Sequence, residues 1–468
     1  MSHNHSASDR IFIALTTLIV LAPLPLAANR AWSWSLLSLA SALLTLIWVV
    51  CRLRGRCRPG LPAARLALPA TLFLTALAWA VLQTLPIMPL SWAHPVWTEA
   101  SAALSRPLGA TISANPEMSG HAVMRLAAYG LIFVLATQLG RQRHRAVWGL
   151  KSVAAAVLVY AAYALFCHLI ELEYILWMPK WAYQGDATGT FVGRAAFGAF
   201  AGIGVLACLA QAIRRSTTQR PSIGTGERIE RLLARTVPWL IASGFLWLAV
   251  LASHSRGAFL VTGAGCLALL TAATIGRLVR LRQTLALLLV LTGLAGGAVL
   301  ADGGTTLARM SGEGDLTGDR PNLMRLTWAA IDDAPLTGHG LGTFAIAIMP
   351  YRDTSLPRPV LYNHAHNSWE EVIMDLGWPA GLCLIFAVMI PVAVCCAGLV
   401  RRRQDQIFPA LAVAVATLLG LQAIIDFTVQ IPALAALFAY LLGIGYSQSW
   451  SVNTTNDSGK DLIIPPGQ

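Results

Sequence analysis

Long apolar segments alternate with short polar segments along almost the whole chain. Each apolar segment is about 20 residues long, the length that an α-helix needs to cross the hydrocarbon core of a bilayer. The pattern therefore predicts an all-α polytopic membrane protein with about twelve transmembrane helices. The predicted spans cover residues 11–28, 32–51, 66–90, 122–139, 147–170, 192–213, 237–253, 257–276, 284–301, 377–400, 407–427 and 431–447. Because the first span runs directly into further apolar segments, we do not interpret it as a cleavable signal peptide.

The composition supports this prediction. Of the 468 residues, 56% are hydrophobic and only 12% are charged, whereas an ordinary soluble domain carries about 25% charged residues. The net charge of +12 could indicate nucleic-acid binding in a soluble protein. Here the basic residues lie in short loops between apolar spans, so the positive-inside rule explains them and we expect no nucleic-acid partner.

Lysine and arginine residues also predict the orientation, because they are in excess in loops on the cytoplasmic side. Every second predicted loop is strongly basic, and both termini fall on the basic side. The basic loops are 52–65, 141–145, 214–236, 277–283 and 401–406. We therefore predict a multi-pass protein of the cytoplasmic membrane with both termini in the cytosol.

The segment between the ninth and tenth spans is the longest on the opposite side, at about 75 residues. A long structured loop in a protein otherwise made of spans usually carries function. The chain is thus predicted to comprise a bundle of about nine spans (1–301), a periplasmic loop that contains the candidate motifs described below (302–376), three last spans (377–447) and a polar cytosolic tail (448–468). The eight cysteines fall within spans or on the cytosolic side, which predicts no disulfide framework.

Several arginines lie on the side where the positive-inside rule disfavours them. They are Arg194, Arg256, Arg309, Arg320, Arg325, Arg352 and Arg358. A single arginine at this boundary can reach lipid phosphates by snorkelling. Several together favour an anionic ligand, since the planar guanidinium donates two hydrogen bonds at once to phosphate oxygens.

The second candidate group is the segment Asn363-His364-Ala365-His366-Asn367-Ser368-Trp369-Glu370-Glu371. Two histidines two residues apart could bind a metal, but no matching set of further ligands is found and no CxxC pair is present. A histidine titrates near neutrality, so His366 or His364 could act as a general base. Glu370, Glu371 or Asp375 could orient the imidazole. The structural alternative is that Asn367 simply caps a helix that begins there.

The third group is the glycine-rich segment from Pro335 to Phe344. It lacks the spacing of a dinucleotide-binding turn, and no P-loop lysine follows it. We interpret it as a tight re-entrant turn packed against the membrane.

Between residues 185 and 440, motifs follow one another in an order known from one family. They are Ser255-Arg256-Gly257, Arg320, Trp328, Pro335 to Gly338, Gly340 to Phe344, Tyr351-Arg352, His364 to Asn367, Glu371, Asp375 to Gly377, and Asp426-Phe427 with Gln430 to Ala433. In these motifs the chain resembles the O-antigen ligase/polymerase family of bacterial envelope glycosyltransferases. It departs at Ala195, where the family usually carries an asparagine after the arginine that corresponds to Arg194.

The resemblance implies a C-type glycosyltransferase-like architecture in the bacterial inner membrane, with an inverting reaction on the periplasmic side. It implies an undecaprenyl-diphosphate-linked glycan as donor and neither a metal nor another cofactor. The implied roles are diphosphate binding by Arg256, Arg320, Arg194 and Arg325, general base catalysis by His366 or His364 supported by Glu371, and glycan or acceptor contacts by Arg352, Asn367 and Tyr351.

The acceptor stays open. A ligase would use lipid A-core or a protein hydroxyl, whereas a polymerase of O-antigen or exopolysaccharide would use a second lipid-linked glycan. A transporter of the same lipid-linked glycan is an alternative from another class. It is disfavoured because the centres of the predicted spans carry few ionisable residues.

Overall fold

The computed structural model of the chain describes residues 6–57, 60–217, 225–280, 320–356 and 361–451, together with residues 282 and 293. Three sequence predictions fall largely or wholly outside these residues. They are the span 284–301 apart from Gly293, the two arginines Arg309 and Arg358, and the tail beyond residue 451.

The described chain is almost entirely helical, as predicted. The α-helices are α1 (Ala7–Leu21), α2 (Ala31–Leu53), α3 (Ala63–Leu82), α4 (Val96–Ala103), α5 (Pro116–Leu139), α6 (Arg143–Leu169), α7 (Arg194–Thr217), α8 (Thr225–Ala252), α9 (Arg256–Ile275), α12 (Arg320–Asp333), α13 (Phe344–Ala347), α14 (Ser368–Arg401), α15 (Ile407–Ile425) and α16 (Pro432–Gln448). Short 3-10 helices are η1 (Leu26–Ala28), η2 (Leu90–Trp92), η3 (Met349–Tyr351) and η4 (Thr428–Gln430). One feature departs from the all-α prediction, a two-residue antiparallel ribbon of β1 (Tyr174–Ile175) and β2 (Met178–Pro179).

Within the described residues, nine helices are long and apolar enough to cross a membrane. A helix also covers most of the last predicted span (α16, 17 residues) and residues 11–21 of the first one (α1, 15 residues), whose remainder forms a turn and η1. These observations make the protein a polytopic, multi-pass membrane protein. The total of about twelve spans stays a prediction.

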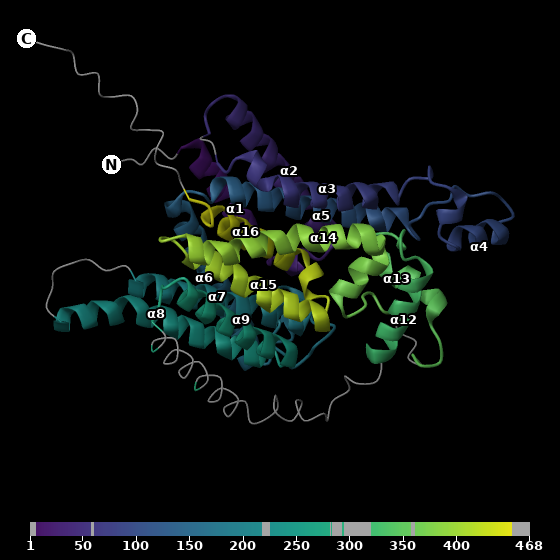
Figure 1. The fold of residues 1–468 in the computed structure, drawn as a ribbon. Helices are drawn as coiled ribbons and strands as arrows, with labels where there is room; N and C mark the ends of the chain where they lie inside the picture. Colours follow the sequence, from purple (N-terminus) through teal and green to yellow (C-terminus); the bar gives the residue numbers. More distant parts are fainter. Residues whose placement is uncertain are drawn as a thin grey trace, which may run out of the picture.

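The helices form three groups in Figure 1, with α1, α2, α3 and α5 on one side, α6 to α9 on the other, and α14 to α16 between them. Helix α7 is central, because its side chains from Ala196 to Ile213 are buried. Its glycines let neighbours approach closely: a Cβ on Gly198 would lie 2.6 Å from the Cβ of Ala258 in α9. Helix α2, in contrast, exposes leucines such as Leu36 and Leu39, as expected of a helix that faces lipid.

Polar contacts gather at two opposite ends of the bundle. At one end, Asp9 contacts Arg145 (2.7 Å), and Arg143 contacts Asp405 (2.7 Å). These contacts join the amino-terminal helix to two of the predicted cytosolic loops. The other end carries α12, α13 and the turns described below (Figure 1). Which end faces the cytosol stays a prediction from the charge pattern.

Helix α14 bends where the predicted loop meets the predicted span. Gly377 has φ +72° and ψ 167°, so α14 consists of two helical parts that join at this residue. The segment 334–343 packs into the bend, where the N–H of His339 donates to the carbonyl of Met374 (3.0 Å) and that of Gly340 to Asp375 (2.9 Å). Gln83 of α3 also donates to the Asp375 carbonyl, at 2.9 Å. The carbonyls that the bend releases are thereby satisfied inside the protein, as an apolar environment demands.

Candidate functional site

The loop that carries His364 and His366 is fixed to the first turn of α14 by Glu371. One carboxylate oxygen of Glu371 lies 2.8 Å from Nδ1 of His364, and the other accepts a hydrogen bond from the N–H of Ala365 at 2.8 Å. Glu371 is only 2% exposed. Both of its oxygens therefore have partners, and the imidazole of His364 has one orientation.

His366 has a different carboxylate partner, Asp426, which directly follows α15. Its Nδ1 lies 3.4 Å from Oδ1 of Asp426, an ion-pair distance that is longer than a well-formed hydrogen bond. Asp426 also accepts hydrogen bonds from the N–H of Phe427 (2.8 Å) and the hydroxyl of Thr428 (3.0 Å). The sequence had suggested Glu370, Glu371 or Asp375 as the residue that orients a histidine. Glu371 holds this position for His364, whereas Asp426 holds it for His366.

The backbone of His366 is unusual, with φ +56°. Left-handed conformations of residues other than glycine are uncommon and often occur at functional sites, where the surrounding structure enforces them. The preceding loop and the helix cap that follows both restrain His366.

Phe427 lies against both imidazoles. Its ring is nearly parallel to that of His364, with centroids 4.3 Å apart and an angle of 16°, and it meets His366 edge to face at 5.3 Å. We refer to His364, His366, Glu371, Asp426 and Phe427 as the histidine cluster. The cluster joins the start of α14 to the end of α15.

The electrostatics of the histidine cluster differ between its two pairs. Burial alone would lower the pKa of His364, but the charge and hydrogen bond of Glu371 outweigh it, and the net pKa is raised. Burial alone would raise the pKa of Asp426, but its contacts with His366, Phe427 and Thr428 outweigh it and hold the net pKa below the ordinary value. His364 thus keeps a proton more readily than an ordinary histidine, while Asp426 stays ionised.

Asn367 caps α14, as the sequence predicted. Its side-chain oxygen accepts hydrogen bonds from the N–H groups of Trp369 (3.1 Å) and Glu370 (3.4 Å). Ser368 and Trp369 then tie the helix to α15 through its backbone: the Ser368 hydroxyl donates to the Asp426 carbonyl at 3.1 Å, and the Trp369 indole to Gly420 at 3.1 Å. This segment therefore has a structural role, and the side chains of His364 and His366 stay partly exposed.

A second polar group lies where α8 meets α9. Asp186, from the loop before α7, contacts both Arg194 (3.0 Å) and His254 (2.7 Å). Burial raises the pKa of Asp186, but hydrogen bonds from His254 and Arg194 lower it more, so the carboxylate stays ionised. Arg194 was predicted from the sequence and Asp186 was not, because only folding brings Asp186 to Arg194.

Arg256 is the first residue of α9, after the N-cap Ser255. The next residue, Gly257, packs against the end of α15: a Cβ placed on it would lie 2.6 Å from Cδ1 of Ile425. Ile425 directly precedes Asp426 of the histidine cluster. The start of α9 is therefore placed next to the part of α15 from which Asp426 and Phe427 extend.

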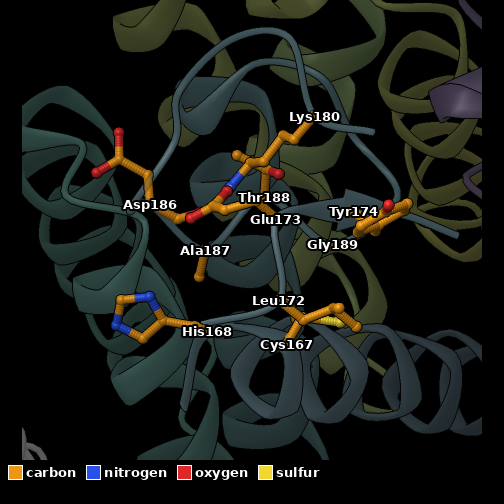
Figure 2. Close-up of a pocket in the computed structure, with 11 residues that line it drawn as sticks. Cys167, His168, Leu172, Glu173, Tyr174, Lys180, Asp186, Ala187, Thr188 and Gly189 are labelled. Carbon is orange, nitrogen blue, oxygen red and sulfur yellow. The ribbon is translucent and has the colours of Figure 1, made fainter. Parts of the chain in front are cut away.

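The loop 170–193 encloses a small pocket (Figure 2). The buried Lys180 donates to the Asp186 carbonyl (2.6 Å) and lies 3.1 Å from Glu173. Figure 2 shows the carboxylate of Asp186 directed away from Tyr174. These contacts fold the loop and hold Asp186 in position for Arg194, so we assign the pocket a supporting role.

The other predicted residues lie on α12 and the segment after it. Arg320 is the exposed first residue of α12. Arg325 pairs with Asp353 at 2.6 Å, and both side chains are solvent-exposed. The Tyr351 hydroxyl donates to Asp333 at 2.9 Å. Arg352 lies over the ring of Tyr362, at 5.5 Å.

The described residues contain no group of three or more histidine, cysteine, aspartate or glutamate side chains arranged to hold a metal ion. In this part of the chain each of the two neighbouring histidines instead faces one carboxylate, Glu371 or Asp426.

One charged residue near the histidine cluster was missed by the sequence analysis. Arg125 lies in α5, within the predicted span 122–139, where few ionisable residues were expected. Its guanidinium lies 4.7 Å from the ring of Trp34, and a Cβ on Gly342 would lie 3.8 Å from its Nη2. Its positive charge also acts on His364, where it opposes the effect of Glu371 on the pKa. The sequence alone could have pointed to Arg125, because an arginine inside an apolar segment often has a functional role.

Comparison with known protein families gives a match over part of the chain. The model of a family described as O-antigen ligase matches residues 241–385. This stretch contains Arg256, Arg320, His364, His366 and Glu371. A search of the curated proteins finds no match. The segment 241–385 is thus similar to the O-antigen ligase family, in agreement with the resemblance of the sequence motifs.

Proposed function

We propose that this protein is a glycosyltransferase that moves a glycan from a polyprenyl-diphosphate donor to an acceptor hydroxyl, in the manner of an O-antigen ligase. The reaction would take place at the end of the bundle that carries the histidine cluster, on the periplasmic side. The observation that carries the proposal is the presence of two histidine–carboxylate pairs around Phe427, next to the start of α9 at Arg256.

In the proposed mechanism His366 is the general base. It takes the proton of the acceptor hydroxyl while that oxygen attacks the anomeric carbon of the donor sugar. The bond from this carbon to the diphosphate oxygen breaks, and the diphosphate leaves with the electron pair. Attack from the face opposite the leaving group inverts the anomeric carbon. Asp426, kept ionised by its contacts, then stabilises the imidazolium of His366.

His364 is the second candidate for the general base because of its pKa. Because its net pKa is raised by Glu371, it holds its proton over more of the neutral range and is a poorer base. A protonated His364 would instead add a positive charge close to the leaving diphosphate. Glu371 acts as a positioning residue that fixes the loop from His364 to Asn367.

The leaving diphosphate needs cationic stabilisation as its charge develops. Arg256 and Arg320 would provide it, with Arg194 and Arg325 as further donors. Arg194 uses one of the five N–H donors of its guanidinium to contact Asp186, so the other donors stay available. The position of Arg256 at the start of α9 adds the positive end of a helix dipole.

Glycan or acceptor contacts are proposed for Arg352, Asn367 and Tyr351. The donor already carries its leaving group, so the proposed reaction needs neither a metal nor another cofactor. An acceptor of the ligase reaction would be lipid A-core, whereas a repeat-unit polymerase would use a second lipid-linked glycan.

The test uses purified protein in liposomes with undecaprenyl-diphosphate-linked glycan as donor. One sample receives lipid A-core and the other only more donor, and products are separated on gels. A shift of lipid A-core alone indicates a ligase, and a ladder from donor alone indicates a polymerase. No product in either sample, with donor bound and Arg256→Ala abolishing that binding, would overturn the transferase proposal in favour of transport.

The base is tested with His366→Asn, because asparagine tolerates the left-handed backbone of this position. We expect kcat to fall by about 10²–10⁴-fold, the usual contribution of a general base. Asp426→Asn should lower kcat by a smaller factor. His144→Asn, at the opposite end of the bundle, is the matched control. Full activity of His366→Asn would contradict the assignment of His366.

A further inference from the structure

A polar group without enough partners lies beside the histidine cluster, where α2 packs against α5. Its centre is Arg125, whose guanidinium lies over the indole of Trp34 on one side and next to Gly342 on the other. Tyr129 follows Arg125 by four residues and so extends from the same face of α5. Asp375 lies close by, because its Oδ2 accepts a hydrogen bond from the N–H of Gly342 at 2.6 Å. We refer to Trp34, Arg125, Tyr129 and Asp375 as the Arg125 cluster.

The hydrogen-bonding capacity of the Arg125 cluster is largely unused. Within the described ranges, the guanidinium of Arg125 has neither a hydrogen bond nor a carboxylate within ion-pair distance. The indole N–H of Trp34, the hydroxyl of Tyr129 and Oδ1 of Asp375 are buried and have no hydrogen-bond partner among the described residues. Asp375 is only 4% exposed. Three donors and one acceptor thus meet without satisfying one another.

Such a group is costly inside a membrane. A cation or a buried donor without a partner is strongly disfavoured in hydrocarbon, and the contact between Arg125 and Trp34 offsets only part of that cost. A ligand with anionic oxygens would satisfy the donors. Because Oδ1 of Asp375 is buried without a hydrogen-bond partner, the ligand should also bring a hydroxyl that pairs with it. A phosphate attached to a sugar has both features.

The position of the Arg125 cluster suits a lipid-linked ligand. Helix α2 exposes Trp32, Leu36 and Leu39, so its outer face is apolar and suited to lipid. The inner side of the cluster adjoins the histidine cluster, since the charge of Arg125 acts on His364. A lipid-linked sugar diphosphate that approached along α2 would therefore reach Arg125 before or together with the histidines.

We propose that Arg125 binds a phosphate of the lipid-linked donor, with Trp34 and Tyr129 as further hydrogen-bond donors and Asp375 Oδ1 as acceptor for a hydroxyl of the first sugar. This inference rests on the proposed function, because it assumes that a lipid-linked glycan diphosphate is the donor. It adds a phosphate-binding residue from the first half of the chain, outside the segment 241–385 that matches the family.

The experiment measures binding separately from transfer. Purified protein in phosphatidylcholine liposomes is titrated with undecaprenyl diphosphate, undecaprenyl phosphate and phosphatidylglycerol, using the wild type, Arg125→Gln and Arg125→Lys. The exposed Arg106, in the loop between α4 and α5, gives the matched control Arg106→Gln. We expect Arg125→Gln to weaken binding of undecaprenyl diphosphate at least tenfold, Arg125→Lys to weaken it less, and Arg106→Gln to leave it unchanged.

Three other outcomes would overturn the inference, and a fourth would overturn only the proposed function. Equal losses for undecaprenyl diphosphate and phosphatidylglycerol would make the Arg125 cluster a general lipid site. Unchanged binding in Arg125→Gln, together with a lower melting temperature that Asp375→Asn restores, would make Arg125 a structural counter-ion of Asp375. Normal transfer by Arg125→Gln at low donor concentration would also overturn it while leaving the proposed function intact. Donor binding that depends on Arg125 without any transfer would overturn only the proposed function.

Discussion

At the scale of single residues, the two neighbouring histidines differ because their carboxylate partners differ. Glu371 lies within the same helix turn and forms a short contact with His364, which raises the pKa of that histidine against the effect of burial. Asp426 comes from another helix end and lies farther from His366, at 3.4 Å. In the proposed mechanism the same residue type therefore has two roles, a positive charge at His364 and a base at His366.

The first prediction concerns the pH dependence of stability. The pKa of His364 is raised above its unfolded value of about 6.5, so its pair with Glu371 stabilises the fold fully below that pH. The stabilisation is lost as the pH rises through the folded pKa. Glu371→Gln should therefore destabilise the protein by about 1–3 kcal/mol at pH 6 and by less at pH 9. Melting temperatures in detergent at the two pH values measure this.

The exposed Glu117, in the first turn of α5, provides the control variant Glu117→Gln. An equal loss of stability in Glu371→Gln at pH 6 and pH 9 would show that the pair between His364 and Glu371 acts in its uncharged form.

At the scale of elements, the bend in α14 decides where the histidine cluster lies. The part of α14 before Gly377 carries the cap and the carboxylates, while the part after it continues as a span. The bend is possible because residue 377 is a glycine and because the segment 334–343 supplies hydrogen bonds to the carbonyls before it. This glycine-rich segment therefore helps to place the histidine cluster.

The second prediction concerns this bend. Gly377 has a φ and ψ that only glycine adopts easily, and a Cβ on it would lie 2.5 Å from the carbonyl oxygen of Leu336. Gly377→Ala should cost about 1–3 kcal/mol of stability and reduce transfer. In α9, Gly263 has open space around it, so Gly263→Ala should be neutral or slightly stabilising. Equal melting temperatures of the two variants in detergent would contradict this explanation of the bend.

At the scale of the whole molecule, the helices place two kinds of polar chemistry at opposite ends. One end joins the amino-terminal helix, the start of α6 and the loop between α14 and α15 through Asp9, Arg143, Arg145 and Asp405. The other end gathers the histidine cluster, Arg194 with Asp186, and the Arg125 cluster. The end that carries Arg143 and Arg145 is the one that the loop charges predict to be cytosolic.

The third prediction concerns orientation. In a cysteine-free variant, single cysteines replace Gln184 and Thr354 at one end, and Gln142 and Gln404 at the other. A membrane-impermeant maleimide should label the first two in intact spheroplasts and the last two only after permeabilisation. Labelling of all four before permeabilisation, or of one residue from each end, would contradict the predicted alternation of the loops.

The sequence by itself determined the properties that depend on neighbours along the chain. The length of the apolar segments predicted the helices, because a transmembrane span needs about 20 apolar residues whichever helices it packs against. The cap at Asn367 was also local, because capping depends on single residue types. The match to the O-antigen ligase family confirmed the resemblance that these local motifs carried.

Only the tertiary structure decided which charged groups meet. Asp426 faces His366, Asp186 holds Arg194, and Arg125 lies beside Gly342, although each pair comes from different elements. Hydropathy places an element in the membrane but does not fix its rotation or its neighbours, which depend on how small residues such as Gly198 and Gly257 allow helices to pack. The small ribbon of β1 and β2 was likewise missed, because four residues are too few to show a strand pattern. The helices of this protein were thus fixed by local sequence, and its site by the packing that brings distant residues together.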